Sequence, residues 1–164
     1  KVVQVTIDKD AKQVEGWLFN PDKDSEPRLI KGLGELFKNE KGEVDGYGRK
    51  WLYFQILNGD AIDGYKPTYL ARNEKGKKVL YGEVSAHDEL VALTTDKECW
   101  QVIVNRYKSW YPDVITYKVH GNGEEISVDW LQLLQMYIDC AYMQRTPNDR
   151  LDALVTLKKL GVEF

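Results

Sequence analysis

Residues 2–7 (Val-Val-Gln-Val-Thr-Ile) place the strongest constraint on the fold of this chain. Val2, Val3, Val5 and Ile7 are apolar and β-branched, and few polar residues interrupt them. Such a run is typical of a strand that is buried on both faces, as in the interior of a parallel sheet. The run therefore predicts an α/β fold. If this strand is internal in a parallel sheet, one of its edges is left exposed in this chain. We therefore expect a partner strand from another polypeptide.

Helix signals dominate the chain after residue 48. Thr95 and Glu98 have the spacing of a capping box at a helix start. Gly59 and Gly161 follow predicted helix ends. Residues 29–37 are only weakly patterned, and residues 38–48 are charged and contain glycine. His87 is expected at a helix start. The other expected elements are a helical turn over 11–14, a strand over 15–19, helices over 49–58 and 95–110, a basic hairpin tip at 75–78, a hairpin over 115–127, and helices over 128–144 and from residue 146 to 160.

The composition is that of one globular domain, or one and a half, without a membrane segment. The chain has 164 residues and carries 23 basic against 26 acidic side chains, a net charge of −3. This length supports one good core, and this balance argues against a strongly basic nucleic-acid-binding domain. No apolar run approaches the roughly 20 residues of a membrane span, and residues 1–10 lack the apolar core of a signal peptide. Cys99 and Cys140 lack a metal-binding spacing, so we expect two buried free thiols in a reducing cytoplasm.

The first acidic pair, Asp8 and Asp10, directly follows the apolar strand. In parallel α/β sheets, ligand crevices form at the carboxyl ends of the strands. Residues two apart in an extended segment point the same way, so both carboxylates are expected to project into that crevice. They repel each other unless a cation lies between them. The alternative interpretation is a solvated turn or a helix cap.

The second acidic pair is Asp60 and Asp63, between Gly59 and Gly64. Residues three apart lie on one face of a helical turn. Four oxygen-donor side chains in two such pairs suit Mg²⁺ or Mn²⁺ rather than zinc. The alternative is an ordinary loop. An EF-hand is excluded, because Lys12 stands where that motif needs Asp or Asn.

Together, the two pairs and their surroundings resemble the C-terminal half of the 5′-nuclease superfamily, the flap endonucleases and 5′→3′ exonucleases. Residues 6–10 (Thr-Ile-Asp-Lys-Asp) resemble the first Asp pair of that family. Residues 51–65 (Trp-Leu-Tyr-Phe-Gln-Ile-Leu-Asn-Gly-Asp-Ala-Ile-Asp-Gly-Tyr) resemble its second pair. The Gly-Tyr at 64–65 and the stretch 129–145 are most similar to the bacteriophage enzymes. The specific motifs cover residues 6–19 and 47–66, and the resemblance is loose from 67 to 164.

The resemblance implies a fold and a reaction. Residues 1–66 would be the C-terminal part of an α/β catalytic core, with a partial Rossmann-like (PIN-like) parallel sheet layer. Residues 67–164 would be a mainly helical DNA-binding region with a degenerate helix–three-turn–helix element. The reaction would be hydrolysis of DNA phosphodiesters at 5′ ends and flaps by two Mg²⁺ or Mn²⁺ ions about 4 Å apart. The implied metal ligands are Asp8, Asp10, Asp60 and Asp63, and the implied location is the cytoplasm of an infected bacterial cell.

Two departures from the family pattern qualify that expectation. The first metal cluster of the family lies in an N-terminal half, and no such segment precedes Lys1 in this sequence. The Gly-rich helix–three-turn–helix motif is replaced by residues 65–71 (Tyr-Lys-Pro-Thr-Tyr-Leu-Ala). Phosphate contacts would then come from cationic side chains. The candidates are Lys9, Lys66, Arg72, Lys75, Lys77 and Lys78.

Two other functions stay open at this point. The chain can be a DNA- or protein-binding module that is not an enzyme alone and needs a separate N-terminal half to complete an active site. It can also be a structural domain whose Asp pairs are coincidental.

Overall fold

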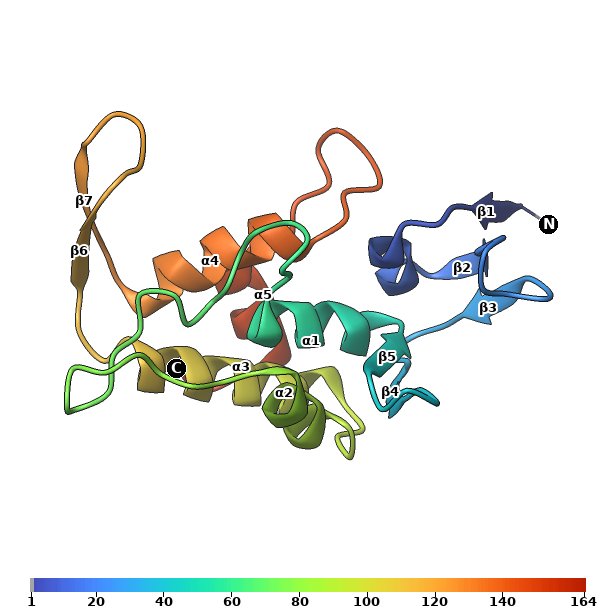
Figure 1. The fold of residues 1–164 in the computed structure, drawn as a ribbon, viewed down its shortest axis with the longest axis horizontal. Coiled ribbons are helices and arrows are strands. Elements are labelled where there is room, and N and C mark those ends of the chain that lie inside the picture. The colour runs from blue at the N-terminus through green and yellow to red at the C-terminus, as the bar shows by residue number, and fades with distance from the viewer. Residues whose placement is uncertain (1) are drawn as a thin grey trace.

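The computed structural model describes residues 2–164, and within them the fold is mixed α/β. Three small sheets and a 3-10 helix accompany five α-helices (Figure 1). The strands are β1 (Val3–Val5), β2 (Gly16–Phe19), β3 (Arg28–Ile30), β4 (Glu35–Lys38), β5 (Val44–Tyr47), β6 (Ile115–Lys118) and β7 (Glu125–Val128). The helices are η1 (Lys9–Gln13), α1 (Arg49–Asn58), α2 (Glu83–Leu90), α3 (Asp96–Trp110), α4 (Trp130–Ala141) and α5 (Ala153–Leu160).

The strand predicted from residues 2–7 is β1, and it lies at the edge of a three-stranded sheet. β1 pairs in parallel with β2, which pairs antiparallel with β3. Parallel pairing is confined to these two strands within residues 2–164. The side chains of Val5 and Ile7 are 63% and 66% exposed, so the expected burial on both faces is wrong for this chain. The second neighbour that an interior strand requires is not present among the described residues.

The helix predicted over 49–58 is confirmed as α1, and it is the central element of the fold. Residues 50–57 are all buried, so every face of α1 is covered. α2, α3 and α4 contact it, as do η1, β4 and β5 (Figure 1). Tyr107 of α3 donates a buried hydrogen bond of 2.8 Å to the carbonyl of Ile56.

The main hydrophobic core contains residues from both sides of position 66, from Leu36 to Val162. A second, smaller cluster consists of Ala11, Leu18 and Ile30 under the three-stranded sheet. The division of the chain at residue 66 stays a prediction.

The other helices match the sequence signals in part. Thr95 and Glu98 form the predicted capping box of α3, and the hairpin over 115–127 is confirmed as β6–β7. The start of the last helix at residue 146 is wrong: Asp152 caps α5, and Asp149 instead binds Arg145 within a loop. His87 lies in the last turn of α2 rather than at its start.

No helix within residues 2–164 combines the length and the apolar character needed to cross a membrane.

Both cysteines are free thiols, as expected, but only Cys99 is buried. Cys140 lies exposed on α4, so its expected burial is wrong. The weakly patterned residues 29–37 and the charged, Gly-containing residues 38–48 contribute to the short strands β3, β4 and β5 that precede α1. These strands have three or four residues each, which is too short for a clear alternating pattern.

Candidate metal centre

Three of the four predicted carboxylates meet at one place. Asp10, Asp60 and Asp63 each offer an oxygen atom, and these atoms lie within 4.8 Å of one another. Asp10 comes from η1, just after β1, and Asp60 directly follows the C-terminal glycine of α1. Asp60 is buried, Asp10 is half-buried and Asp63 is exposed. The cluster therefore opens to solvent on the Asp63 side.

A tight turn after α1 brings Asp63 back toward Asp60. The backbones of Asp60 and Tyr65 exchange two hydrogen bonds of 3.0 Å, which closes the turn. The Oδ1 atom of Asp60 accepts a hydrogen bond of 2.9 Å from the backbone N–H of Ile62. Gly59 enters the turn with φ +78° and ψ −173°, a conformation essentially restricted to glycine. The sequence Gly-Asp-x-x-Asp-Gly thus folds as a turn and not as a helix.

The surroundings shift the pKa values of Asp10 and Asp60 in opposite directions. Burial raises the pKa of Asp10, and the negative charges of Asp8, Asp63 and Asp60 raise it further against the hydrogen bond from Gln55. Burial also acts to raise the pKa of Asp60, but its ion pair with Lys9 and its backbone N–H partners outweigh burial, and the pKa is lowered. The charge of Asp60 is thus partly compensated within the chain, whereas that of Asp10 is not.

The hydroxyl of Tyr65 is a buried polar atom without a partner. Its oxygen is inaccessible to solvent and makes no hydrogen bond within residues 2–164. Burial raises the pKa of Tyr65, and the charges of Asp60 and Asp10 raise it further. Buried hydroxyls are nearly always hydrogen-bonded, and this one is an exception within the described residues. The all-oxygen donor set fits Mg²⁺ or Mn²⁺.

Asp8 is not part of this group. Its side chain accepts a hydrogen bond of 2.9 Å from the N–H of Asp10 and caps η1. Because residues 9–13 form a 3-10 helix, Asp8 and Asp10 do not have the extended geometry that points both side chains the same way. Asp8 instead lines a separate cavity of about 270 Å³ together with Lys12 and Asp45.

Three of the six predicted DNA-binding cations, Lys9, Lys66 and Arg72, make side-chain hydrogen bonds or ion pairs within the described residues, and Arg72 is nevertheless exposed. Lys9 pairs with Asp60 in the cluster. Lys66 donates to the carbonyl of Asn58 at 2.8 Å, and Arg72 donates to two carbonyls of its own loop. The remaining three lie exposed at the turn that follows Asn73, with one ammonium over the ring of Tyr69; they are Lys75, Lys77 and Lys78.

Sequence reasoning missed the buried polar residues that support the cluster. Gln55 of α1 donates a hydrogen bond of 2.5 Å to Asp10, and Gln13 contacts Gln55 at 3.4 Å. The indole N–H of Trp51 donates to the carbonyl of Lys9 at 3.1 Å. The only signal in the sequence is that Gln55 interrupts the run of large apolar and aromatic residues from Trp51 to Leu57.

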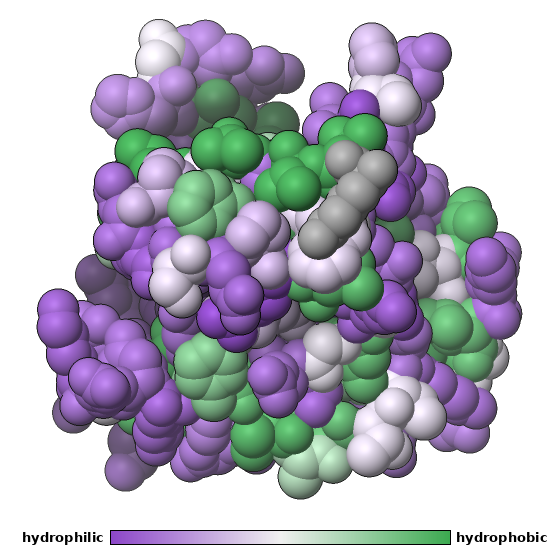
Figure 2. Space-filling view, turned by 90° about the vertical axis from the view of Figure 1, so that its right-hand side faces the viewer, coloured by the Kyte–Doolittle hydropathy of each residue, from purple (hydrophilic) through white to green (hydrophobic). Residues whose placement is uncertain are grey.

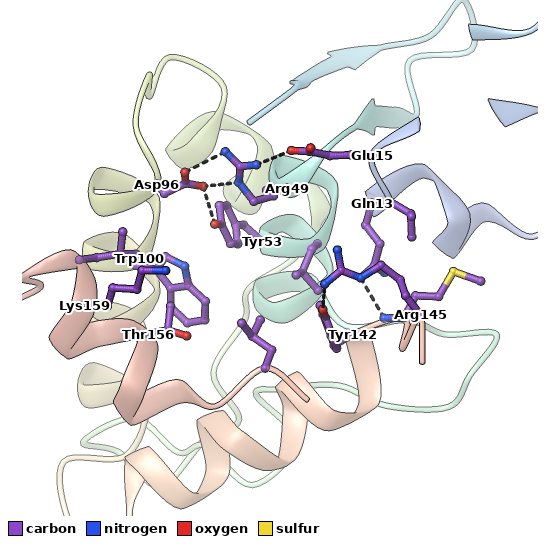
Figure 3. A pocket seen from close by; sticks show the side chains of 15 residues that line it. Gln13, Glu15, Arg49, Tyr53, Asp96, Trp100, Tyr142, Arg145, Thr156 and Lys159 are labelled. Atoms are coloured by element: carbon purple, nitrogen blue, oxygen red, sulfur yellow. Dashed lines mark hydrogen bonds and ion pairs between the residues drawn. The ribbon is translucent and has the colours of Figure 1, made fainter. Parts of the chain in front are cut away.

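A larger pocket lies at the other end of α1. Its volume is about 410 Å³, and its polar wall is an ion-pair network (Figure 3). Arg49 binds both carboxylate oxygens of Asp96, at 2.8 and 3.0 Å, and binds Glu15 at 2.7 Å. Tyr53 donates to Asp96 at 2.6 Å. These groups satisfy one another, so this wall ties β2, α1 and α3 together.

No protein-family model matches the chain, and comparisons with curated proteins and with solved structures give no match either.

Gly59 and Gly64 provide a matched test of the turn. Their φ values are +78° and +75°, but a Cβ at Gly59 would lie 2.5 Å from the carbonyl oxygen of Tyr65, whereas one at Gly64 would meet nothing within 4 Å. We expect Gly64→Ala to lower the free energy of unfolding by about 1 kcal/mol and Gly59→Ala by about 2–4 kcal/mol. Urea denaturation measures both, and equal losses would contradict the geometry.

The Asp96 network predicts a dependence of stability on pH. Burial acts to raise the pKa of Asp96, but hydrogen bonds from Arg49 and Tyr53 lower it below the ordinary value of 3.8. A lowered pKa stabilises the fold above pH 3.8, and the stabilisation disappears as pH falls through the folded-state value. We expect Asp96→Asn to cost about 1–3 kcal/mol at pH 7 and progressively less below pH 3.8.

The control for this measurement is Asp113→Asn, which changes an exposed side chain away from the network. Urea denaturation at a series of pH values compares the two variants with the original chain. A cost of Asp96→Asn that stays constant down to pH 2 would show that the carboxylate charge is not what stabilises this wall.

Proposed function

We propose that this chain is the C-terminal portion of a metal-dependent 5′→3′ exonuclease or flap endonuclease that hydrolyses DNA phosphodiesters. The observation that carries the proposal is the convergence of Asp10 with Asp60 and Asp63. These residues come from the two motifs on which the family resemblance rests.

In this proposal, Asp10, Asp60 and Asp63 hold Mg²⁺ or Mn²⁺. A divalent ion there supplies neutralisation of charge on a phosphate and lowers the pKa of a bound water. The chain itself contributes a fixed arrangement of carboxylates and a neighbouring cation. The side chain of Lys9 is 32% exposed while it pairs with Asp60.

DNA binding is proposed for the exposed hairpin turn at 73–78. Lys75, Lys77 and Lys78 provide three positive charges on a short segment of a chain whose net charge is −3. Binding through such a turn is electrostatic and independent of base sequence, so its affinity falls steeply with salt. This arrangement replaces the Gly-rich phosphate contact that the family resemblance would otherwise provide.

A partner strand is proposed along the free edge of β1. Thr6 donates its N–H to Phe19 of β2 at 3.1 Å. Because successive backbone N–H groups of a strand point to opposite sides, the N–H of Val5 points away from β2. Figure 2 views this end of the molecule and shows apolar areas among hydrophilic ones. The side chains of Val5 and Ile7 are both exposed. A strand added at this edge would extend a PIN-like layer and bring further carboxylates to Asp10.

One observation favours a second candidate function, a DNA- or protein-binding fragment that is inactive alone. Three carboxylates gather in this chain, and Asp8 lies apart from them. A two-metal site needs more oxygen ligands than this group contains. Under this alternative, the isolated chain binds one metal ion and flap DNA but does not cleave it.

Titration of the isolated chain with Mn²⁺ tests the metal centre. We expect one site, with Asp60→Asn weakening the binding at least tenfold because it removes the negative charge of the most buried carboxylate of the cluster. Asp113→Asn, an exposed substitution elsewhere, should leave the affinity unchanged. In the natural full-length polypeptide, Asp60→Asn should slow the cleavage of a 5′-flap substrate by about 100-fold or more. Wild-type binding and cleavage in Asp60→Asn would refute the proposal.

Hydrogen exchange tests the partner strand. In the isolated chain we expect the N–H of Val5 to exchange rapidly, because it points away from β2, and that of Thr6 to be protected. In the natural full-length polypeptide, or on addition of the segment that completes it, Val5 should become as protected as Thr6. If Val5 still exchanges rapidly there, no strand pairs with this edge.

A further inference from the structure

We propose that Gln55 is a positioning residue for Asp10, and that Gln13 in turn holds Gln55 in place. This inference rests on the proposed function, because the carboxylate that Gln55 positions belongs to the candidate metal centre. Neither glutamine belongs to the acidic motifs, and neither is offered as a metal ligand. Their role is to fix the direction of one ligand.

The two glutamines form a continuous hydrogen-bonded chain inside the protein. Gln55 is 2% exposed, and its Nε2 donates to Oδ1 of Asp10 at 2.5 Å. Gln13, also buried, directs its Nε2 toward Oε1 of Gln55 at 3.4 Å. The same Nε2 donates to the carbonyl of Ala141 at 2.9 Å, and Oε1 of Gln13 accepts from the N–H of Met143 at 2.9 Å.

The main chain sets the polarity of this hydrogen-bonded chain. A carbonyl can only accept and an N–H can only donate, so Ala141 and Met143 allow one orientation of the Gln13 amide. That orientation presents a donor to Gln55, whose Oε1 must face it. The remaining end of Gln55, its NH₂ group, therefore faces Asp10. A reversed Gln55 would place a carbonyl oxygen against a carboxylate, which leaves both without a donor.

A positioned donor is needed at Asp10 because the forces on this carboxylate oppose its place in the cluster. Burial disfavours its charge, and Asp8, Asp63 and Asp60 repel it. A free side chain would turn away from such neighbours. The hydrogen bond from Gln55 offsets part of this cost and occupies one lone pair of the carboxylate, which leaves the other lone pairs for a cation.

The donor is also neutral, and this matters for a metal ligand. Lys9 compensates the charge of Asp60 by an ion pair. A second cation at residue 55 would compete with a metal ion for Asp10. An amide instead fixes the direction of the carboxylate and leaves its full negative charge, as partners of metal-ligating groups commonly do.

The first measurement needs no metal and reads the hydrogen bond directly. In the ¹⁵N–¹H spectrum of the full 164-residue chain, the side-chain amide signals of Gln55 and Gln13 should be protected from exchange. Asp10→Asn should shift the Gln55 signals strongly and the Gln13 signals less, and Asp63→Asn should move neither comparably. Gln55 signals that do not respond to Asp10→Asn would overturn the proposal.

The second measurement is the affinity for Mn²⁺. Gln55→Met keeps the length and burial of the side chain but removes its donor. We expect about tenfold to a hundredfold weaker binding, as for the loss of other partners of metal ligands. The matched control is Gln135→Met. Gln135 lies on α4, donates a hydrogen bond to the carbonyl of Leu151 and accepts one from the N–H of Ala153. The control should lose stability without losing affinity.

The outcomes separate this inference from the proposed function. If the original chain binds Mn²⁺ and Asp60→Asn abolishes binding while a folded Gln55→Met binds normally, the metal centre stands and the positioning role is refuted. If the original chain binds no Mn²⁺, the metal centre fails, and the response of the Gln55 amide signals to Asp10→Asn alone supports or refutes the positioning. Should Gln55→Met not fold, Gln13→Met provides the affinity test, with a weaker loss expected.

Discussion

The burial of residues 50–57 of α1 on every face of the helix is the constraint on which the rest of the structure depends. A helix covered on all faces cannot leave polar groups to water, so each one must be satisfied by a neighbouring element. Lys50 donates to the carbonyl of Val91 beyond α2, and Gln55 donates to Asp10 of η1. The polar residues of α1 therefore determine which loops approach it and in what orientation.

Much of the helical framework could be predicted from sequence because its signals are local. The bounds of α1 follow from the apolar run and from Gly59, and the start of α3 follows from the capping box at Thr95 and Glu98. The approach of Asp63 to Asp60 could also be predicted, since the two lie within a single turn. The approach of Asp10 to Asp60 and Asp63 was predicted from the family resemblance. The residue pattern by itself indicated only that Asp10 follows a strand.

The features that could not be predicted depend on contacts between distant residues. Asp8 separates from Asp10 because residues 9–13 form a 3-10 helix against α1, and nothing in the local sequence distinguishes this from an extended segment. The role of Gln55 depends on Gln13, Ala141 and Met143, which are far away in the chain. α5 begins later than expected because the loop before it is held by the Arg145–Asp149 pair and Asp152 provides the cap.

The direction of α1 determines which sign of charge its C-terminal end stabilises. The aligned peptide dipoles of a helix place about half a negative charge at its C-terminus, and this is the end that Asp60 follows. The carbonyl of Asn58 at this end already attracts the ammonium of Lys66. The three carboxylates therefore add to a negative end, and the same cluster at the N-terminus of α1 would be partly neutralised. The orientation of this buried helix adds to the negative charge of the three carboxylates, which the ammonium groups of Lys9 and Lys66 partly offset.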